Sequence, residues 1–230
     1  MKRRFVLAAL PLAALLAGAA PRSPASEPSA APLPDTVDVA LNTGKGTIVV
    51  ELDAKDAPVT VRNFLRYVDE KRFDGIVFYR SMRLDWGKQP NGLIQAGTRG
   101  DPKRVLPPIA HEPTSETGIL HKAGTLSMAR FAPGTATSEF SILLSDMPSL
   151  DAHPESDDPE ARAGYAAFGH VVAGMDVVKA IWESPLSPTK GEGGLKGQML
   201  DPPVKILTAR RVPDFVPEPK ETAEPVESTD

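Results

Sequence analysis

The fold class of this 230-residue chain is decided by the stretch Val37-Asp38-Val39-Ala40-Leu41, Thr43-Gly44-Lys45-Gly46 and Thr47-Ile48-Val49-Val50-Glu51-Leu52. Its first segment alternates apolar and polar residues, as a half-buried strand does, and its two glycines supply a turn. Its last segment is rich in β-branched and apolar residues, which favour strands. The stretch therefore predicts a β-hairpin.

Beyond the hairpin, short strand-like segments recur along the chain, separated by glycine and proline turns. They span residues 76–81, 93–96, 124–129, 140–144, 166–172 and 204–212. Many short strands with only two helices are typical of a closed barrel or a sandwich. Closure is favoured because it removes exposed strand edges. The sequence therefore predicts a mostly-β domain.

Two segments have the spacing of helices. The first follows the hairpin and carries apolar residues at positions i, i+3, i+4 and i+7, on one helix face: Val61, Phe64, Leu65 and Val68. Asp56 is its candidate N-cap, and Pro58 suits its first turn. The second covers residues 175–182, between the strand that ends near residue 172 and a glycine-rich loop.

The N-terminus has the pattern of an export signal. Three basic residues at positions 2–4 precede a short apolar stretch and a run of small residues. This order predicts a cleavable signal peptide at residues 1–19. The alternative is an uncleaved N-terminal anchor. With cleavage, we expect a periplasmic or secreted protein that keeps no membrane span.

The folded part lies between two segments of biased composition. Residues 20–36 are rich in proline, serine and alanine and are predicted to be an extended linker. Residues 213–230 are acidic and proline-rich, with too little apolar surface to repay the entropy of folding. The domain is therefore predicted at residues 37–212, and we expect it to be monomeric.

The composition excludes several kinds of site. The chain has no cysteine, which excludes disulfides, zinc–thiolate sites and iron–sulfur clusters. Its formal net charge of −4 argues against nucleic acid as a partner, because nucleic-acid binding needs a basic patch. The four histidines are scattered and are interpreted as surface or structural residues: His111, His121, His153 and His170. We expect neither a metal nor a cofactor.

Six stretches occur in an order that resembles the cyclophilin family of peptidyl-prolyl isomerases, in its bacterial, exported branch. Among them are Phe73-Asp74-Gly75-Ile76-Val77-Phe78-Tyr79-Arg80 and Gly124-Thr125-Leu126-Ser127-Met128-Ala129-Arg130; the others lie at residues 47–64, 93–97, 136–140 and 165–178. The resemblance implies an eight-stranded antiparallel β-barrel with a helix over each open end. It also implies isomerisation of X-Pro bonds in proline-containing segments of exported, partly folded proteins.

The resemblance implies a set of site residues as well. Arg80 occupies the position of the catalytic arginine, and Gln95 that of a glutamine that holds the substrate backbone and orients the arginine. We add Trp86, from an apparent insertion at 85–91, as a replacement for a missing aromatic ring. The predicted substrate contacts are Phe78, Trp86, Leu93, Met128, Ala129, Arg130, Glu139, Ser141, Leu150, Tyr165 and Phe168. For Met128 and Phe168 a plain core role is the alternative.

The chemistry of the reaction explains why an arginine suffices. Amide resonance opposes rotation about a peptide bond with a barrier of about 18–20 kcal/mol. An enzyme has to favour the twisted state, in which the nitrogen carries a localised lone pair. A fixed cation that donates a hydrogen bond to this nitrogen does so. Arginine stays charged and presents a rigid fork of donors.

Some positions depart from the family's pattern. Gly92, Ser141 and Ser149 stand where the family has aromatic residues, and Glu139 stands where it has glutamine. Three roles are open for Glu139: pairing with Arg80, competing with substrate for it, or favouring basic residues near the proline. Small residues in the pocket favour a second hypothesis, a catalytically weak peptide-binding module or holdase. The pair Arg80 and Gln95 favours an isomerase.

Overall fold

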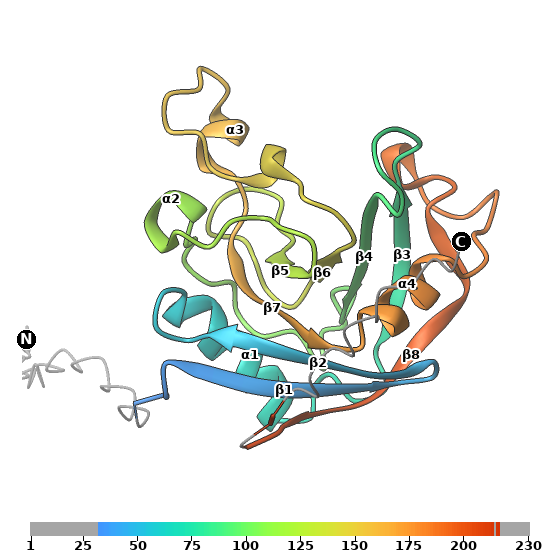
Figure 1. Cartoon of the computed structure of the whole chain (residues 1–230), viewed down its shortest axis with the longest axis horizontal. Helices are drawn as coiled ribbons and strands as arrows, with labels where there is room; N and C mark the ends of the chain where they lie inside the picture. Colours follow the sequence, from blue (N-terminus) through green and yellow to red (C-terminus); the bar gives the residue numbers. More distant parts are fainter. Residues whose placement is uncertain (1–31, 214, 217–230) are drawn as a thin grey trace, which may run out of the picture. The chain divides into compact units, whose positions relative to one another are not determined.

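Eight strands close into an antiparallel barrel in the computed structural model, which describes residues 32–213, 215 and 216 (Figure 1). They are β1 (Thr36–Thr43), β2 (Gly46–Asp53), β3 (Val77–Arg83), β4 (Gly92–Gly97), β5 (Thr125–Met128), β6 (Phe140–Leu143), β7 (Ala167–Ala173) and β8 (Met199–Arg211). Their order around the barrel is β1-β2-β7-β5-β6-β4-β3-β8. The predicted fold class is confirmed. The predicted signal peptide (1–19) and most of the linker (20–36) and tail (213–230) lie outside the described residues.

The hairpin that starts the barrel has the register that its pattern requires. β1 and β2 pair antiparallel, with Val39 opposite Val50 and Thr43 opposite Gly46. The alternate apolar residues all point inward and are buried: Val37, Val39, Leu41, Ile48, Val50 and Leu52. A slip of one residue would expose this whole set, so burial of one face specifies the register.

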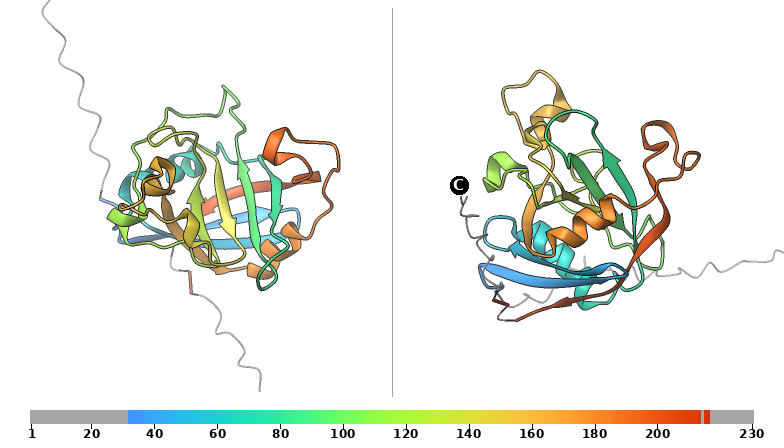
Figure 2. Two further views of the ribbon diagram at one scale, coloured as in Figure 1. Left: turned by 90° about the horizontal axis from the view of Figure 1, so that it is seen from above. Right: turned by 45° about the vertical axis from the view of Figure 1, so that its right-hand side comes forward.

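Two main helices lie at opposite ends of β2. α4 (Met175–Trp182) packs near the start of β2, where Val177 lies against Gly46. α1 (Pro58–Asp69) follows the other end of β2, after Asp53. Figure 2 shows both helices against the barrel from two further directions. The predicted helices are thus confirmed, and the structure adds short ones in the loops: α2 (Thr114–Thr117), α3 (Pro159–Ala163), and the 3-10 turns Pro148–Leu150 and Gly193–Leu195.

The first turn of α1 is capped from a distant loop. Ala57 occupies the N-cap position and makes no side-chain cap, so the predicted cap at Asp56 is wrong. The carboxylate of Glu112 accepts hydrogen bonds from the backbone N–H of Val59 (2.9 Å) and Thr60 (2.7 Å). It also accepts one from the Thr60 hydroxyl (2.6 Å). Glu112 therefore satisfies the free N–H groups of the helix start and complements its dipole.

A cluster of aromatic rings fills the barrel interior under α1. Phe64, on the buried face of α1, contacts three other rings, with centroid distances of 5.0 to 5.4 Å: Phe73, Phe140 and Phe168. Phe78 meets Phe140 edge-on at 6.1 Å. All five side chains are almost completely buried. Such tilted and edge-on packing is favoured for aromatic pairs, so this cluster holds the helix against the barrel.

The last strand is longer than its sequence predicts. β8 begins at Met199 rather than at residue 204, although Pro202 and Pro203 lie between the two. The prolines are tolerated because the ladder skips them: Phe78 pairs with Val204, and Arg80 pairs with Met199. The residues between form an irregularity in β8 that leaves the proline nitrogens outside the ladder.

No helix among the described residues is long and apolar enough to cross a membrane.

The cap by Glu112 makes a stability prediction. We expect Glu112→Ala to lower the free energy of unfolding by about 1–2 kcal/mol, because two backbone N–H groups of α1 lose their acceptor. Urea denaturation followed by circular dichroism measures this change. Glu116→Ala is the matched control, since Glu116 is exposed. Equal stability of the two variants would contradict the capping role.

Candidate active site

One extra residue in β3 decides which face of the barrel wall the Arg80 side chain points to. Phe78 lies opposite Ala96 of β4, and the next paired residue of β3 is Arg80, which lies opposite Gln95. Tyr79 is therefore the unpaired residue of a β-bulge. Paired residues of an antiparallel ladder share a face, whereas the neighbours Gln95 and Ala96 face opposite ways. The bulge thus keeps Phe78 in the core and turns Arg80 to the outer face.

A row of paired residues crosses the outer face of the barrel wall. From β8 to β5 it consists of Met199, Arg80, Gln95, Ser141 and Ser127. The row beside it faces inward and is buried: Val204, Phe78, Ala96, Phe140 and Met128. Four strands therefore carry the polar residues of the site above an apolar core that fixes their positions.

Two amide side chains hold the guanidinium of Arg80. Its Nη1 donates to Gln95 Oε1 at 2.9 Å, and its Nε donates to Gln198 Oε1 at 2.8 Å. Gln198 is placed there because its backbone oxygen accepts from the N–H of Ser81 (2.9 Å). Burial lowers the pKa of Arg80 from its usual value, but arginine stays charged under any ordinary condition. The result is a fixed cation on the barrel surface.

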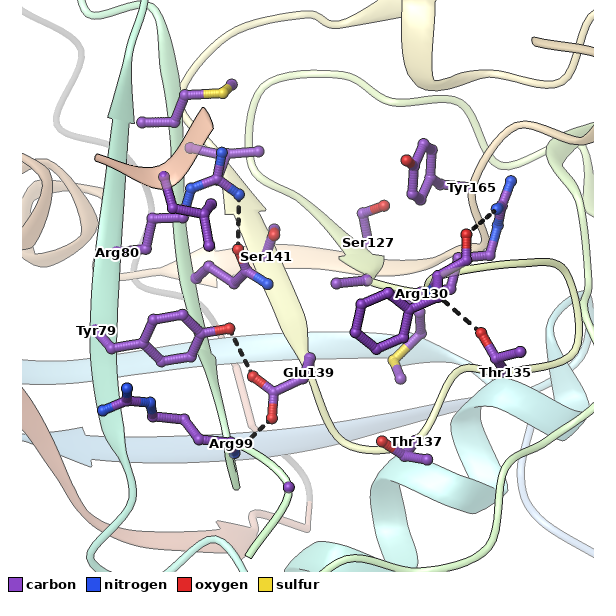
Figure 3. Close-up of a pocket in the computed structure, with 18 of the residues that line it drawn as sticks. Tyr79, Arg80, Arg99, Ser127, Arg130, Thr135, Thr137, Glu139, Ser141 and Tyr165 are labelled. Carbon is purple, nitrogen blue, oxygen red and sulfur yellow. Dashed lines mark hydrogen bonds between the residues drawn. The ribbon is translucent and has the colours of Figure 1, made fainter. Parts of the chain in front are cut away.

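The row forms part of a pocket of about 720 Å³ (Figure 3). Both predicted catalytic residues, Arg80 and Gln95, line it. So do eight of the predicted substrate contacts: Leu93, Met128, Ala129, Arg130, Glu139, Ser141, Leu150 and Tyr165. Met128 belongs to the core as well, because only 2% of its surface is exposed. The structure thus brings together residues from β3, β4, β5, β6 and the loop before β7.

Three predicted contacts do not line the pocket. Phe78 and Phe168 are fully buried in the aromatic cluster, so the alternative core role holds for Phe168, and the prediction for Phe78 is corrected. Trp86 lies in the loop between β3 and β4 with 65% of its surface exposed. It does not fill the place of a missing ring, because it is not among the residues that line the pocket.

The pocket wall lacks fewer large apolar side chains than the sequence predicts. Gly92 does not line the pocket: its φ is +143°, and a Cβ there would lie 2.0 Å from the Met82 oxygen. Ser149 is exposed and also lies outside the pocket lining. Only Ser141 leaves a wall position small. Four further apolar side chains, which the sequence does not predict as contacts, also line the pocket: Met82, Phe131, Leu195 and Met199.

Glu139 does not pair with Arg80. Its carboxylate accepts from the Tyr79 hydroxyl (2.6 Å) and from the backbone N–H of Arg99 (2.7 Å). It fills the space beside Gly97, where a Cβ would lie 2.3 Å from the Glu139 Cδ. Burial, and then the nearby Glu139 carboxylate, raise the pKa of Tyr79 above its usual value, so the hydroxyl remains a donor. Of the three roles considered for Glu139, the structure supports neither pairing with Arg80 nor competition with substrate for Arg80.

Comparison with known proteins identifies the family. The sequence pattern of the family described as "Cyclophilin type peptidyl-prolyl cis-trans isomerase/CLD" matches residues 36–211. This chain is a member of the cyclophilin-type family. A peptidyl-prolyl cis-trans isomerase from Acinetobacter baylyi is 35% identical over 75% of this chain and 84% of its own length. One from Streptomyces antibioticus is 39% identical over 75% of this chain and 96% of its own length.

Solved structures agree on the fold. A crystal structure of a cyclophilin-type peptidyl-prolyl cis-trans isomerase from Cryptosporidium parvum superposes with a TM-score of 0.59. The match covers 77% of this chain and 98% of the other, with 20% sequence identity. At this identity the likeness concerns the barrel alone. The closed barrel of this cyclophilin is therefore shared with a distant relative.

The Arg130 side chain binds neighbouring residues of the pocket wall. Its Nη1 donates to Glu160 (2.8 Å), and its Nη2 donates to the backbone oxygen of Gly164 (2.6 Å). The guanidinium lies 4.6 Å from the ring centroid of Tyr165. Arg130 thus holds the loop that carries Tyr165. Its charge is paired with Glu160, a backbone oxygen and the Tyr165 ring.

Gln198 is the main partner of Arg80 that the sequence did not reveal. It lies 118 positions from Arg80 and follows the turn Gly193–Leu195, in a loop that no strand or helix pattern marks. Only the irregular pairing of β8 brings it beside β3. Among the described residues, no group of three or more acidic or histidine side chains is placed to hold a metal ion.

The contact between Gln198 and Arg80 predicts a catalytic effect. We expect Gln198→Ala to lower kcat for an X-Pro peptide about tenfold, because a hydrogen bond to a charged group contributes roughly 1.5–3 kcal/mol and some of it is replaced by water. Peptide affinity should change little, since Gln198 does not line the pocket. Lys196→Ala is the control, since Lys196 is exposed in the same loop. An unchanged kcat would show that Gln95 alone orients the arginine.

Proposed function

We propose that this chain accelerates the cis–trans isomerisation of X-Pro bonds in exported, partly folded proteins, with Arg80 stabilising the twisted amide. The observation that carries the proposal is the arrangement of Arg80 on the pocket wall. Its Nη1 donates a hydrogen bond to Gln95 and its Nε donates one to Gln198. Among the described residues, its Nη2 has no acceptor. Three of the five N–H groups of a fixed cation, two of them on Nη2, are thus left for the bound polypeptide.

The proposed mechanism uses the difference between the planar and the twisted amide. In the planar amide the nitrogen lone pair is delocalised and accepts hydrogen bonds poorly. In the twisted state it is localised, so a hydrogen bond from Arg80 strengthens only as the bond rotates. Because Gln95 and Gln198 hold the guanidinium beforehand, it needs no reorganisation at that moment. The rate increase comes from this preorganisation.

Gln95 has a second part in the proposal. Its Oε1 accepts from Arg80, which leaves the NH₂ group of the amide as its other polar group. In a pocket where Gln95 is 9% exposed, this group can donate to a backbone carbonyl of the polypeptide. Such a bond would place the X-Pro bond over the arginine. Gln95 therefore both orients the cation and positions the substrate.

The proline ring needs an apolar surface beside this polar row. Met82, Leu93, Met128 and Leu150 supply one along the pocket wall. Burial of a proline ring on such a surface contributes roughly 1–2 kcal/mol. Glu139, which also lines the pocket, supports a preference for substrates with a basic residue near the proline. The small side chain of Ser141 supports the alternative, a peptide-binding module with weak catalysis.

Substitution of Arg80 separates these two functions. We expect Arg80→Lys to lower kcat/KM for an X-Pro peptide about 10²- to 10³-fold, because lysine cannot hold the fork geometry toward both glutamines and the substrate. A protease-coupled isomerase assay measures the rate. Arg62→Lys, on the exposed face of α1, is the matched control. If wild type and Arg80→Lys both gave the uncatalysed rate, the chain would be a binding module.

Export is proposed on the pattern of residues 1–19, a basic start followed by an apolar stretch and small residues. We expect a bacterium that expresses the full chain to accumulate it in the periplasm, starting at Ala20. Intact-mass spectrometry of the periplasmic fraction measures the start of the mature chain. Replacing Arg3 and Arg4 by glutamate should block export, because the positive start of a signal peptide would be lost. A periplasmic protein that retained Met1 would overturn the cleavage site and favour an uncleaved anchor.

A further inference from the structure

A buried histidine links a carboxylate to a serine of the pocket. Asp151 Oδ1 lies 2.7 Å from His121 Nδ1, and His121 Nε2 lies 2.8 Å from Ser127 Oγ. The His121 side chain is completely buried, and the Asp151 side chain is 13% exposed. Ser127 lines the pocket, in the same row as Arg80 and Gln95. None of these three residues has a part in the proposed isomerisation.

The chemistry of the three groups fixes the direction of both hydrogen bonds. An ionised carboxylate only accepts, so the Nδ1 of His121 carries a proton and donates to Asp151. The same Asp151 oxygen accepts from the backbone N–H of His121 at 2.9 Å, which holds it in place. Burial lowers the pKa of His121 below its usual value, by more than the bond to Asp151 raises it, which favours the neutral imidazole. Its Nε2 is then an acceptor, and the Ser127 hydroxyl must donate to it.

Because the Ser127 hydroxyl donates its proton to His121, the pocket wall at Ser127 can only accept hydrogen bonds. Ser127 Oγ has given its only proton to His121, so toward the pocket it can offer lone pairs alone. Its partner across the ladder is Ser141, whose small side chain leaves this part of the wall without a covering ring. Figure 3 shows Ser127 and Ser141 facing the hollow between Arg80 and Tyr165. The wall at this point is a hydrogen-bond acceptor.

We propose that Asp151 and His121 hold Ser127 as a hydrogen-bond acceptor, and that Ser127 binds one backbone N–H of the substrate polypeptide near its proline. The inference rests on the proposed function, because a polypeptide has to occupy the pocket. A backbone N–H fits the acceptor because every residue except proline carries one, and a buried N–H needs a partner. Ser127 is thus a substrate-binding residue, and His121 and Asp151 are positioning residues.

The same three residue types form the catalytic triad of serine hydrolases, but the surroundings differ here. A hydrolase needs free N–H donors for the oxyanion beside its nucleophile. The N–H of Met128 donates to the Ala166 oxygen (2.9 Å), and the N–H of Ala129 donates to the Glu139 oxygen (2.8 Å). The strand therefore leaves neither of them for an oxyanion. The arrangement serves to orient a hydroxyl rather than to attack a carbonyl.

A set of N-methylated peptides tests the contact. Each peptide carries the same X-Pro sequence with one backbone N–H replaced by N–CH₃, and its affinity is measured by calorimetry for wild type, Ser127→Ala and Ser127→Thr. We expect methylation at one position to weaken binding to wild type roughly three- to tenfold. At that position Ser127→Ala should show no further loss, whereas Ser127→Thr, which keeps the hydroxyl, should behave as wild type. No coupled position for Ser127→Ala would overturn the contact.

The positioning role is tested on the histidine itself. In the ¹⁵N NMR spectrum of the free protein, His121 should show a protonated Nδ1 and an unprotonated Nε2 at pH 7. Asp151→Asn keeps the acceptor oxygen and should retain this tautomer and the peptide coupling, whereas Asp151→Ala should lose both. A protonated Nε2 in the wild type would overturn the proposal. If peptides bind and are isomerised without the coupling, only this inference fails; if no X-Pro peptide binds, the proposed function fails with it.

Discussion

The bulge at Tyr79 is the constraint on which the site depends. In a regular ladder, Arg80 would share the face of Phe78 and point into the aromatic core. A guanidinium buried there without partners would cost several kcal/mol, so the fold would not tolerate it. The extra residue resolves this conflict by turning one side chain. The same irregularity on β8 sets Met199 opposite Arg80 and brings Gln198 beside it. One backbone feature thus aims the cation and supplies its support.

The pocket is lined by polar side chains that can form hydrogen bonds and by apolar side chains that can contact a proline ring. Polar side chains come from paired positions on four neighbouring strands, where the ladder fixes their spacing: Arg80, Gln95, Ser141 and Ser127. Apolar side chains come from strand ends and loops: Met82, Leu150, Leu195 and Phe131. Rigid strands hold the groups whose direction matters, because hydrogen bonds depend steeply on geometry. Apolar contacts tolerate placement from loops, because burial of apolar surface has no direction.

The sequence predicted the barrel because its strands follow period-two patterns, as in Val37–Leu41, and its helices bury regular faces, as at Phe64. It also predicted most of the pocket, since the family's motifs place Arg80 and Gln95 directly. It failed where non-local geometry decides. Glu112 caps a helix 52 positions away, and Gln198 reaches Arg80 through an irregular loop. At Gly92 the sequence predicts a missing wall, yet Gly92 does not line the pocket and its backbone packs against Met82. His121 was interpreted as structural, and only its two partners connect it with the pocket.

In the proposed mechanism, Arg80 acts on the rotating bond rather than on binding. NMR exchange spectroscopy on a peptide that saturates the protein measures interconversion of the bound cis and trans forms separately from affinity. For Arg80→Ala we expect that the peptide still perturbs the pocket signals, while interconversion on the protein slows at least about 10²-fold. Interconversion at the wild-type rate in Arg80→Ala, with the peptide bound in the same pocket, would contradict it.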